Sequence, residues 1–334
     1  MWKLANRTPF AAERTFLRDR EGAEVLIVVV KATFAIGDDG AVRVAPEQAP
    51  IARTPQFHGD PARTSLVHDD DFALTKARTD VLLSGHARTI DDQPSIAVEV
   101  KLSVGAWSKR LVAIGERRWK ESLSGWRLTD PEPFTQMPLV YERAFGGVDR
   151  SANPPVECDE NPVGVGFLAP STKPSDGDRA PNLESRDDPM RDPRSRPPPM
   201  CFAPIARQWS ARRRLAGTYD DVWLRERRPL VPGDFDDAFW SSAPPDQRVA
   251  LEGGERVELQ GVSPRGTIRF ELPRLAFSFR TRIAGATVEH SPGFHTLLFE
   301  PDVRRFVMVF QSALPCHHDI HSLERTVVEE RSAA

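Results

Sequence analysis

The sequence predicts a mainly β protein, with antiparallel sheets in a sandwich-like arrangement and a few short helices. Strand-like alternation of apolar and polar residues fills both ends of the 334-residue chain. Thirty prolines and 21 glycines against five methionines favour strands with long loops over a helical bundle. Residues 138–244 keep no steady period, yet they carry bulky anchors that a plain linker would not need. We therefore expect β-rich parts at 1–137 and 245–316, an irregular Pro/Gly/Trp-rich segment packed between them, and a polar tail at 317–334, compatible with one integrated domain.

The N-terminal part begins with the most apolar segment of the chain. Glu24–Ile36 is apolar on both faces before it alternates, which is typical of a central strand. Asp38–Gly40 supplies a turn, and Ala41–Glu47 is expected to return as the hairpin partner. The further strands expected here are 79–87, 94–104 and 108–119, and alternation in the second of them predicts a buried row of Ile96, Val98, Val100 and Leu102.

The C-terminal part resumes the strand pattern at 256–262, 266–273 and 275–283. Residues 295–311 are typical of a hairpin, and Glu300–Val303 supplies its turn. Beyond His317 the chain is polar, so we expect a frayed or weakly helical end.

The irregular middle carries two short helix signals and one polar stretch. Helices of two or three turns are expected within Ile205–Leu215 and Asp234–Trp240, with Asp234 capping the second. Ser171–Pro199 is dense in Pro, Asp, Arg and Ser, which favours a flexible excursion around the more apolar Pro181–Glu184.

Composition narrows the function classes. A net charge of −3 and a pI of about 6.3 provide no global attraction to nucleic acid or to an anionic membrane. The longest apolar run, Val25–Val30, is far below the roughly 20 residues of a membrane span, and no apolar region typical of a signal peptide follows the start. Three widely spaced cysteines argue against a disulfide framework. We expect a cytoplasmic protein without membrane insertion, nucleic-acid binding or cofactor.

The common catalytic signatures are missing from the sequence. The phosphate loop GxxxxGK[ST], the dinucleotide GxGxxG, HExxH, CxxC and the GxSxG elbow do not occur, so we predict no catalytic residue. An enzyme remains the alternative, because a carbohydrate- or peptidoglycan-acting hydrolase needs two carboxylates roughly 5 to 10 Å apart. Five tryptophans lie near four carboxylates in the sequence: Trp119, Trp126, Trp209, Trp223 and Trp240, and Glu116, Asp130, Asp220 and Asp236.

Four further clusters each have a plain and a functional interpretation. Cys316–His321 (CHHDIH) holds metal-ligand types, but neighbours on an extended chain diverge, which favours an exposed strand end. His68–Phe72 (HDDDF) is a cation-cluster candidate, and a solvated turn is the favoured interpretation. Arg212–Arg214 with Arg207 is expected to be a solvated helix face, the alternative being a contact for an acidic partner. Tyr141–Gly147 (YERAFGG) embeds two charges among apolar residues, so we expect them to be compensated and to tie down the loop around Asn161.

A dozen short motifs resemble one known family, and they occur in order over residues 2–315. They include NRTPF, VVVKATF, TDVLLSGHA, GERRW, MPLVYERAFGG, NPVGVGF, PNLE, AGTYDDVWLRERRPLVPGDFD, LEGGE and LLFEPD. The family is catalogued as a bacterial domain of unknown function, number twenty-one sixty-nine. The resemblance implies work as a type VI secretion adaptor or chaperone, which loads an effector onto the VgrG/PAAR spike. It assigns no catalytic residue.

The hypothesis that follows is a non-enzymatic adaptor whose middle segment and an exposed sheet edge capture the effector by shape, aromatic burial and β-augmentation. A structural component of the secretion machine is a third alternative. The expected partners are the effector and the VgrG/PAAR spike protein. The residues expected to contact a partner lie in the middle segment: Arg143, Asn161, Asn182, Glu184, Trp209, Tyr219 and Trp223.

Overall fold

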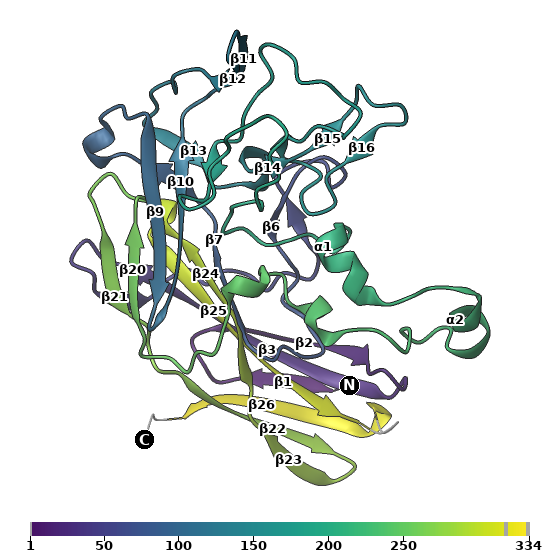
Figure 1. Ribbon diagram of the computed structural model, residues 1–334. Helices are drawn as coiled ribbons and strands as arrows, with labels where there is room; N and C mark the ends of the chain where they lie inside the picture. The colour runs from purple at the N-terminus through teal and green to yellow at the C-terminus, as the bar shows by residue number, and fades with distance from the viewer. Residues whose placement is uncertain (1, 317–319, 332–334) are drawn as a thin grey trace.

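The computed structural model describes residues 2–316 and 320–331, and it confirms the mainly β fold class. Three larger sheets of seven, five and four strands make the body, and two-stranded ribbons join them (Figure 1). In the described residues, no helix has the length and apolar character needed to cross a membrane.

The seven-stranded sheet is built around β3 (Glu24–Ile36), which lies between β2 and β25 as a central strand should. Alternate side chains of β3 enter two apolar clusters, Leu26 and Val28 on one face and Val25 and Ile27 on the other. The predicted hairpin with β4 forms, although β4 is shorter than expected. The other strands are β2 (Ala11–Arg18), β4 (Val42–Val44), β7 (Thr79–Leu83), β19 (Arg248–Val249), β24 (Gly293–Glu300) and β25 (Arg305–Pro315).

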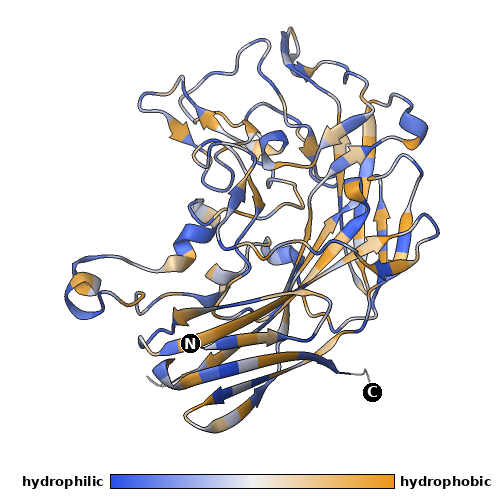
Figure 2. Ribbon diagram, turned by 180° about the vertical axis from the view of Figure 1, so that it is seen from behind, coloured by the Kyte–Doolittle hydropathy of each residue, from blue (hydrophilic) through white to orange (hydrophobic). Residues whose placement is uncertain are grey.

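The five-stranded sheet packs against the seven-stranded sheet through aromatic side chains. Phe270 stacks on Phe306 with ring centroids 5.0 Å apart, and Phe306 stacks on Phe34 at 5.3 Å. The strands, in spatial order, are β18 (Leu183–Glu184), β10 (Trp107–Ile114), β9 (Ala97–Val104), β20 (Arg256–Gln260) and β21 (Ile268–Glu271). Figure 2 shows apolar residues concentrated along the paired strands of the body.

The predicted buried row on β9 is only partly correct. Val100 and Leu102 are fully buried, and Val98 is half-buried. Ile96 is 52% exposed, because β9 begins after it and nothing packs over that end of the strand. The hairpin predicted at 295–311 is confirmed: β24 and β25 pair across a turn that starts at Pro301.

The polar tail is a strand, so the expected frayed or helical end is wrong. β26 (Leu323–Arg331) is the second strand of the four-stranded sheet, where it pairs in parallel with β1 (Lys3–Asn6) and antiparallel with β22 (Ala276–Ile283). β23 (Ala286–His290) forms the far edge. One face of β26 buries Leu323 and Val328 while charged side chains cover the other, so its composition looks polar although it is half in the core.

Outside the three larger sheets, the chain is ordered by two-stranded ribbons and single turns. The ribbons pair β5 (Gln56–Phe57) with β6 (Leu66–His68), β8 (His86–Arg88) with β13 (Gln136–Pro138), β11 (Trp119–Ser122) with β12 (Gly125–Leu128), β14 (Phe145–Gly146) with β17 (Val165–Gly166), and β15 (Val148–Asp149) with β16 (Val156–Glu157). The α-helices are α1 (Ser210–Arg213) and α2 (Asp221–Glu226). The 3-10 turns are η1 (Ile90–Asp92), η2 (Tyr141–Arg143), η3 (Arg214–Ala216), η4 (Asp237–Trp240), η5 (Pro245–Gln247), η6 (Pro301–Val303) and η7 (Ile320–Ser322).

Both predicted helices exist in shortened form, and the predicted cap is wrong by two residues. Asp236, not Asp234, caps η4: its side chain accepts a hydrogen bond from the Ala238 amide at 2.8 Å. Asp234 is used instead to close the loop that carries α2, a helix that the sequence analysis did not separate from its surroundings.

Candidate partner-binding site

Residues 218–234 form an arm that leaves the body after η3 and returns to it before η4. The neck of the arm is closed by Asp234, whose carboxylate accepts from the Thr218 amide at 2.9 Å and from its hydroxyl at 2.7 Å. Gly217 turns the chain into the arm with a φ of 83°, a conformation that favours glycine. In Figure 1, α2 lies at the outer end of this arm, clear of the sheets. The fold therefore presents a defined projection.

The tip of the arm is a single short helix with fixed ends. Asp220 caps it by accepting from the Trp223 amide at 2.8 Å. The Trp223 ring packs edge-on against Tyr219, with centroids 4.7 Å apart, and its Nε1 donates to the Leu230 carbonyl at 2.8 Å. Trp223 is thus a pin that joins the two halves of the arm.

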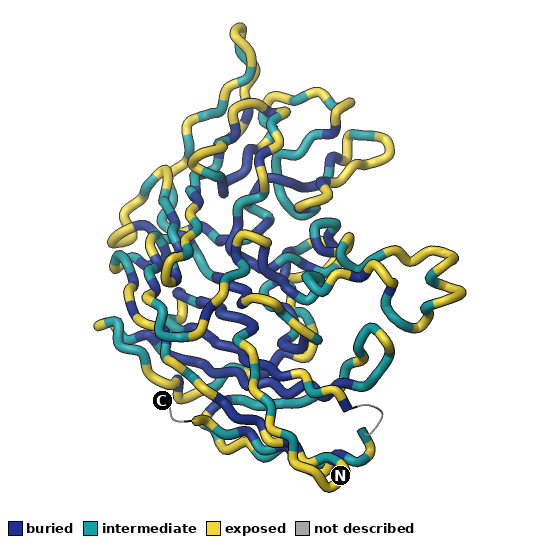
Figure 3. The backbone as a smooth tube through the Cα atoms, turned by 60° about the horizontal axis from the view of Figure 1, so that its bottom comes forward, coloured by how far each residue is buried: buried dark blue, intermediate teal, exposed yellow. Residues whose placement is uncertain are grey.

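Three large apolar side chains are exposed on the arm, among charged ones such as Asp221 and Arg225. The exposed fractions are 56% for Tyr219 and 49% each for Val222 and Leu224. Figure 3 shows this segment as one of the long exposed excursions of the chain. Fully burying an exposed aliphatic side chain of this size contributes about 1.5 to 3 kcal/mol, and about half of that is left to gain for a side chain that is already half-buried. These side chains are therefore suited to contact another protein.

The arm also contacts the turn between β2 and β3. Arg227 donates to the Arg20 carbonyl at 2.8 Å and pairs with Glu21 at 3.5 Å. Leu230 lies directly over Gly22, where an added Cβ would meet its side chain at 2.8 Å. These contacts hold one side of the arm against the seven-stranded sheet and leave the other side free.

The base of the arm is anchored by Arg212, which corrects the predicted solvated face at Arg212–Arg214. Its guanidinium is 2% exposed and pairs with Asp69 at 2.7 Å. It also donates to the carbonyls of Phe239 at 2.7 Å and Ile205 at 3.0 Å. Arg213 and Arg214 are exposed as expected. One arginine of the run therefore joins α1 and η4 to the body.

The acidic stretch His68–Phe72 is a buried ion-pair network, so the expected solvated turn is wrong. Asp71 pairs with Lys31 at 2.8 Å and with His68 at 3.0 Å. Burial alone would raise the pKa of Asp71, but His68 and Lys31 lower it below its ordinary value. Burial would also raise the pKa of Asp69, but the charges of Arg212 and Arg207 outweigh this effect and lower that pKa. The cations are supplied by distant segments, which the local sequence could not reveal.

Four of the seven predicted contact residues are buried, so a partner cannot reach them in this fold. Asn161 donates to the carbonyls of Tyr141 and Phe145, both at 2.9 Å. Asn182 donates to the Ile114 carbonyl at 3.0 Å. Glu184 and Trp209 complete this group: the first pairs with Arg117 at 2.5 Å, and the second packs edge-on against Tyr141.

Arg143 is half-buried and pairs with Glu116 while it donates to Asn182 at 3.1 Å. Its neighbour Glu142 accepts from the amide and hydroxyl of Ser65 at 2.7 and 2.6 Å. The charges of Glu142 and Arg143 are compensated as predicted, but their partners lie outside the loop around Asn161. That loop is fixed by the side chain of Asn161 itself. Of the predicted contact residues, Tyr219 and Trp223 are the ones that the arm presents.

Val222 and Leu224 were missed by sequence reasoning, although a signal was available. Val222, Trp223 and Leu224 are consecutive, and consecutive helical residues point about 100° apart. A single helix turn at the surface cannot bury all three. Trp223 points toward the returning half of the arm, where it donates to the Leu230 carbonyl, so the flanking aliphatic side chains are left outside.

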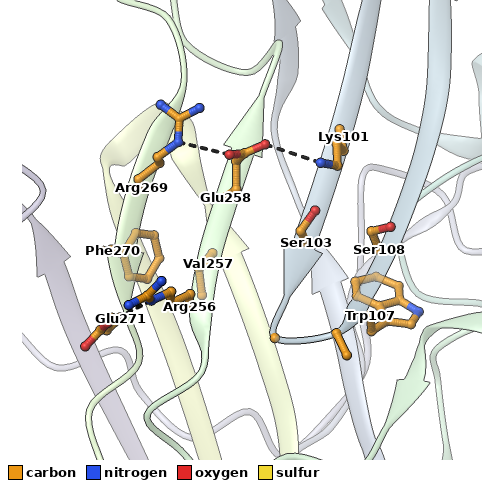
Figure 4. A pocket seen from close by; sticks show the side chains of 12 residues that line it. Lys101, Ser103, Trp107, Ser108, Arg256, Val257, Glu258, Arg269, Phe270 and Glu271 are labelled. Atoms are coloured by element: carbon orange, nitrogen blue, oxygen red, sulfur yellow. Dashed lines mark hydrogen bonds and ion pairs between the residues drawn. The ribbon is translucent and has the colours of Figure 1, made fainter.

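A hollow of about 560 Å³ lies on the five-stranded sheet, away from the arm (Figure 4). Glu258 stands at its centre and accepts from Lys101 at 3.3 Å and Arg269 at 2.9 Å. Hydrogen bonds from Arg269 and Lys101 lower the pKa of Glu258, which keeps it ionised rather than suited to donate a proton. These contacts are typical of ion pairs on an exposed sheet face and less typical of a catalytic cleft.

Three of the four carboxylates near the tryptophans have other partners, and the fourth, Asp130, is exposed. Asp220 and Asp236 cap helices, and Glu116 pairs with Arg143 and Arg179. Across residues 2–316 and 320–331, no group of three or more His, Cys, Asp and Glu could hold a metal ion. His317, His318 and Asp319 lie outside the described residues, and with them most of the CHHDIH candidate.

One protein-family profile matches residues 21–311, and its description reads "uncharacterized protein conserved in bacteria (DUF2169)". The chain belongs to this family. The DUF2169 match contains the arm, its buried base and most of the two larger sheets, whereas β1 and β26 of the four-stranded sheet fall outside it. No curated protein and no solved structure matches the chain.

Proposed function

We propose that this DUF2169 protein is a non-enzymatic adaptor or chaperone that binds a type VI secretion effector in the cytoplasm and helps to load it onto the VgrG/PAAR spike. The arm binds an apolar segment of the effector through Tyr219, Val222 and Leu224. The body holds the arm in place, and no chemical step on the effector is required.

One observation carries this proposal. Three large apolar side chains are exposed on a projection whose neck, tip and base are each fixed by hydrogen bonds or ion pairs. A fold that rigidly holds an apolar surface in water loses little conformational entropy when a partner covers it. Burial of the remaining exposed half of the three side chains contributes roughly 2 to 4.5 kcal/mol before the costs of association, which suits capture followed by release.

Three of the four carboxylates near the tryptophans, Glu116, Asp220 and Asp236, serve as helix caps or ion-pair partners. These structural roles disfavour the hydrolase alternative. The third alternative, a structural component of the secretion machine, uses the same surface in a permanent complex. The stability of the complex therefore separates adaptor from component.

The test measures binding of purified protein to the effector and spike proteins encoded beside its own gene. Val222→Ser with Leu224→Ser is expected to weaken effector binding by about tenfold to a hundredfold, since two aliphatic contacts are lost. Leu123→Ser, at the fully exposed tip of the β11–β12 ribbon, is the matched control and should bind like the wild type.

Circular dichroism must show that the arm variant stays folded. If wild-type protein binds neither neighbouring protein, or if the arm variant and the Leu123→Ser control bind equally well, the arm is not the site. A complex with the spike that persists through size exclusion without the effector would favour a structural component.

A further inference from the structure

A second group of charged residues gathers at the end of the body where the turns of the two larger sheets meet. Arg265 lies in the turn between β20 and β21, Arg304 in the turn between β24 and β25, and Arg88 at the end of β8. Asp38 comes from the turn between β3 and β4. These four segments are far apart in the sequence, and they line two adjoining hollows of about 360 and 230 Å³.

The guanidinium groups of Arg265 and Arg304 meet at one atom. Both contact the same oxygen of Asp38, Oδ1, at 2.6 and 3.3 Å. Asp38 and Arg265 are 70% and 71% exposed, so this ion pair contributes little to stability and yields readily to a stronger anion. The Asp38 carboxylate thus occupies the position of an anionic ligand.

Arg304 is held in place for this role. Its backbone is left-handed, with a φ of 50°, which is uncommon for a residue other than glycine. Its Nε and Nη2 donate to the carbonyls of Ile36 and Gly37 at 3.1 and 2.6 Å, which leaves Nη1 directed at Asp38. The guanidinium is therefore positioned before any ligand arrives.

Arg88 adds a positive charge to the same wall. It donates to the neutral Gln136 side chain at 2.7 Å, and its carboxylate neighbour Asp92 is 4.0 Å away. Two other carboxylates line these hollows: Asp302 pairs with His86 at 2.7 Å, and Asp39 accepts from the Ala41 amide at 3.0 Å. Three arginines consequently face hollows in which Asp38 is the acceptor that two of them share.

We propose that these hollows bind a small phosphate-bearing ligand, held by Arg88, Arg265 and Arg304 after it displaces Asp38. A phosphate group has three terminal acceptor oxygens and up to two negative charges, so it can accept from three guanidinium groups where one carboxylate cannot. The site lies on different segments from the arm and does not depend on the proposed adaptor function.

Calorimetric titration of the purified chain with inorganic phosphate and with pyrophosphate, at low ionic strength and pH 7.5, tests the proposal. Wild-type protein should bind pyrophosphate more tightly than phosphate, and added NaCl should weaken both. Arg265→Ala and Arg304→Asn should each lower the affinity by about tenfold, because each removes one charge-assisted contact; Asn tolerates the left-handed backbone.

Asp38→Ser should raise the affinity by about three- to tenfold, since the competing carboxylate is gone. Arg256→Ala is the matched control, because that arginine is 88% exposed on the sheet face of Figure 4 and should not affect binding. Equal affinities for wild type, Arg265→Ala and Arg304→Asn overturn the proposal.

In a second titration, the ligand is a hexaglutamate peptide. Tight peptide binding without phosphate or pyrophosphate binding also overturns the proposal and indicates an acidic protein partner instead. Effector binding by Arg265→Ala is measured in parallel. Unchanged effector binding shows that the phosphate site is independent of the arm, so that either proposal can be refuted without the other.

Discussion

The pair Arg212 and Arg213 offers a direct test of the buried base of the arm. Arg212→Met keeps much of the side-chain volume but leaves Asp69 at the interface with Arg207 alone, at 3.3 Å. It also removes the donors to the Phe239 and Ile205 carbonyls. Breaking a buried ion pair by removing one partner costs about 3 to 5 kcal/mol. Arg213→Met, one residue along and exposed, should stay within about 0.5 kcal/mol of the wild type.

Urea denaturation followed by tryptophan fluorescence measures the difference. With a slope of about 3 kcal/mol per molar urea, the Arg212→Met midpoint should fall by about 1 to 1.7 M, while that of Arg213→Met should hardly move. Adding Asp69→Asn to Arg212→Met should recover part of the loss, because the unpaired carboxylate is then neutral. Equal midpoints for the two single variants would refute the assignment of Arg212 to the core.

Two further predictions concern stability. Burial lowers the pKa of His290 to about 4 and that of His295 to about 3, so the unfolded chain binds protons that the folded chain does not as the pH falls below about 6.5. The free energy of unfolding should therefore fall by about 1.4 kcal/mol per pH unit for each histidine between pH 6 and 5; urea titrations that give a flat profile there would contradict this. Gly115→Ala should be strongly destabilising, because its Cβ would overlap the Glu132 backbone, whereas Gly233→Ala meets no atom within 4 Å and should leave the melting temperature nearly unchanged.

The sequence predicts the fold well where the residues of a single strand are enough to reveal how that strand is buried. Glu24–Ile36 shows apolar residues on both faces because both faces are buried, and this pattern is visible without knowing the neighbours. β26 gives the opposite case. Its buried side is Leu323, Thr326 and Val328, and the charged residues between them mask a strand that is stabilised mostly by pairing with β1 and β22.

The candidate site was only partly predictable for a similar reason. Tyr219 and Trp223 were selected as aromatic anchors, and the arm does present them. Asn161, Asn182 and Glu184 were selected as polar residues in the motif-rich middle segment. Their hydrogen bonds run to segments 16 to 68 residues away, and sequence spacing gives no sign of such contacts.

The pairing of β1 with β26 sets the order in which this protein can be completed during synthesis. β26 lies between β1 and β22, so β1 has no neighbour in its sheet until residues 323–331 have been synthesised. Closing so long a loop is slow, and until then the edges of β1 and β22 are open to other chains. The four-stranded sheet therefore depends on β26 to cover both of these edges.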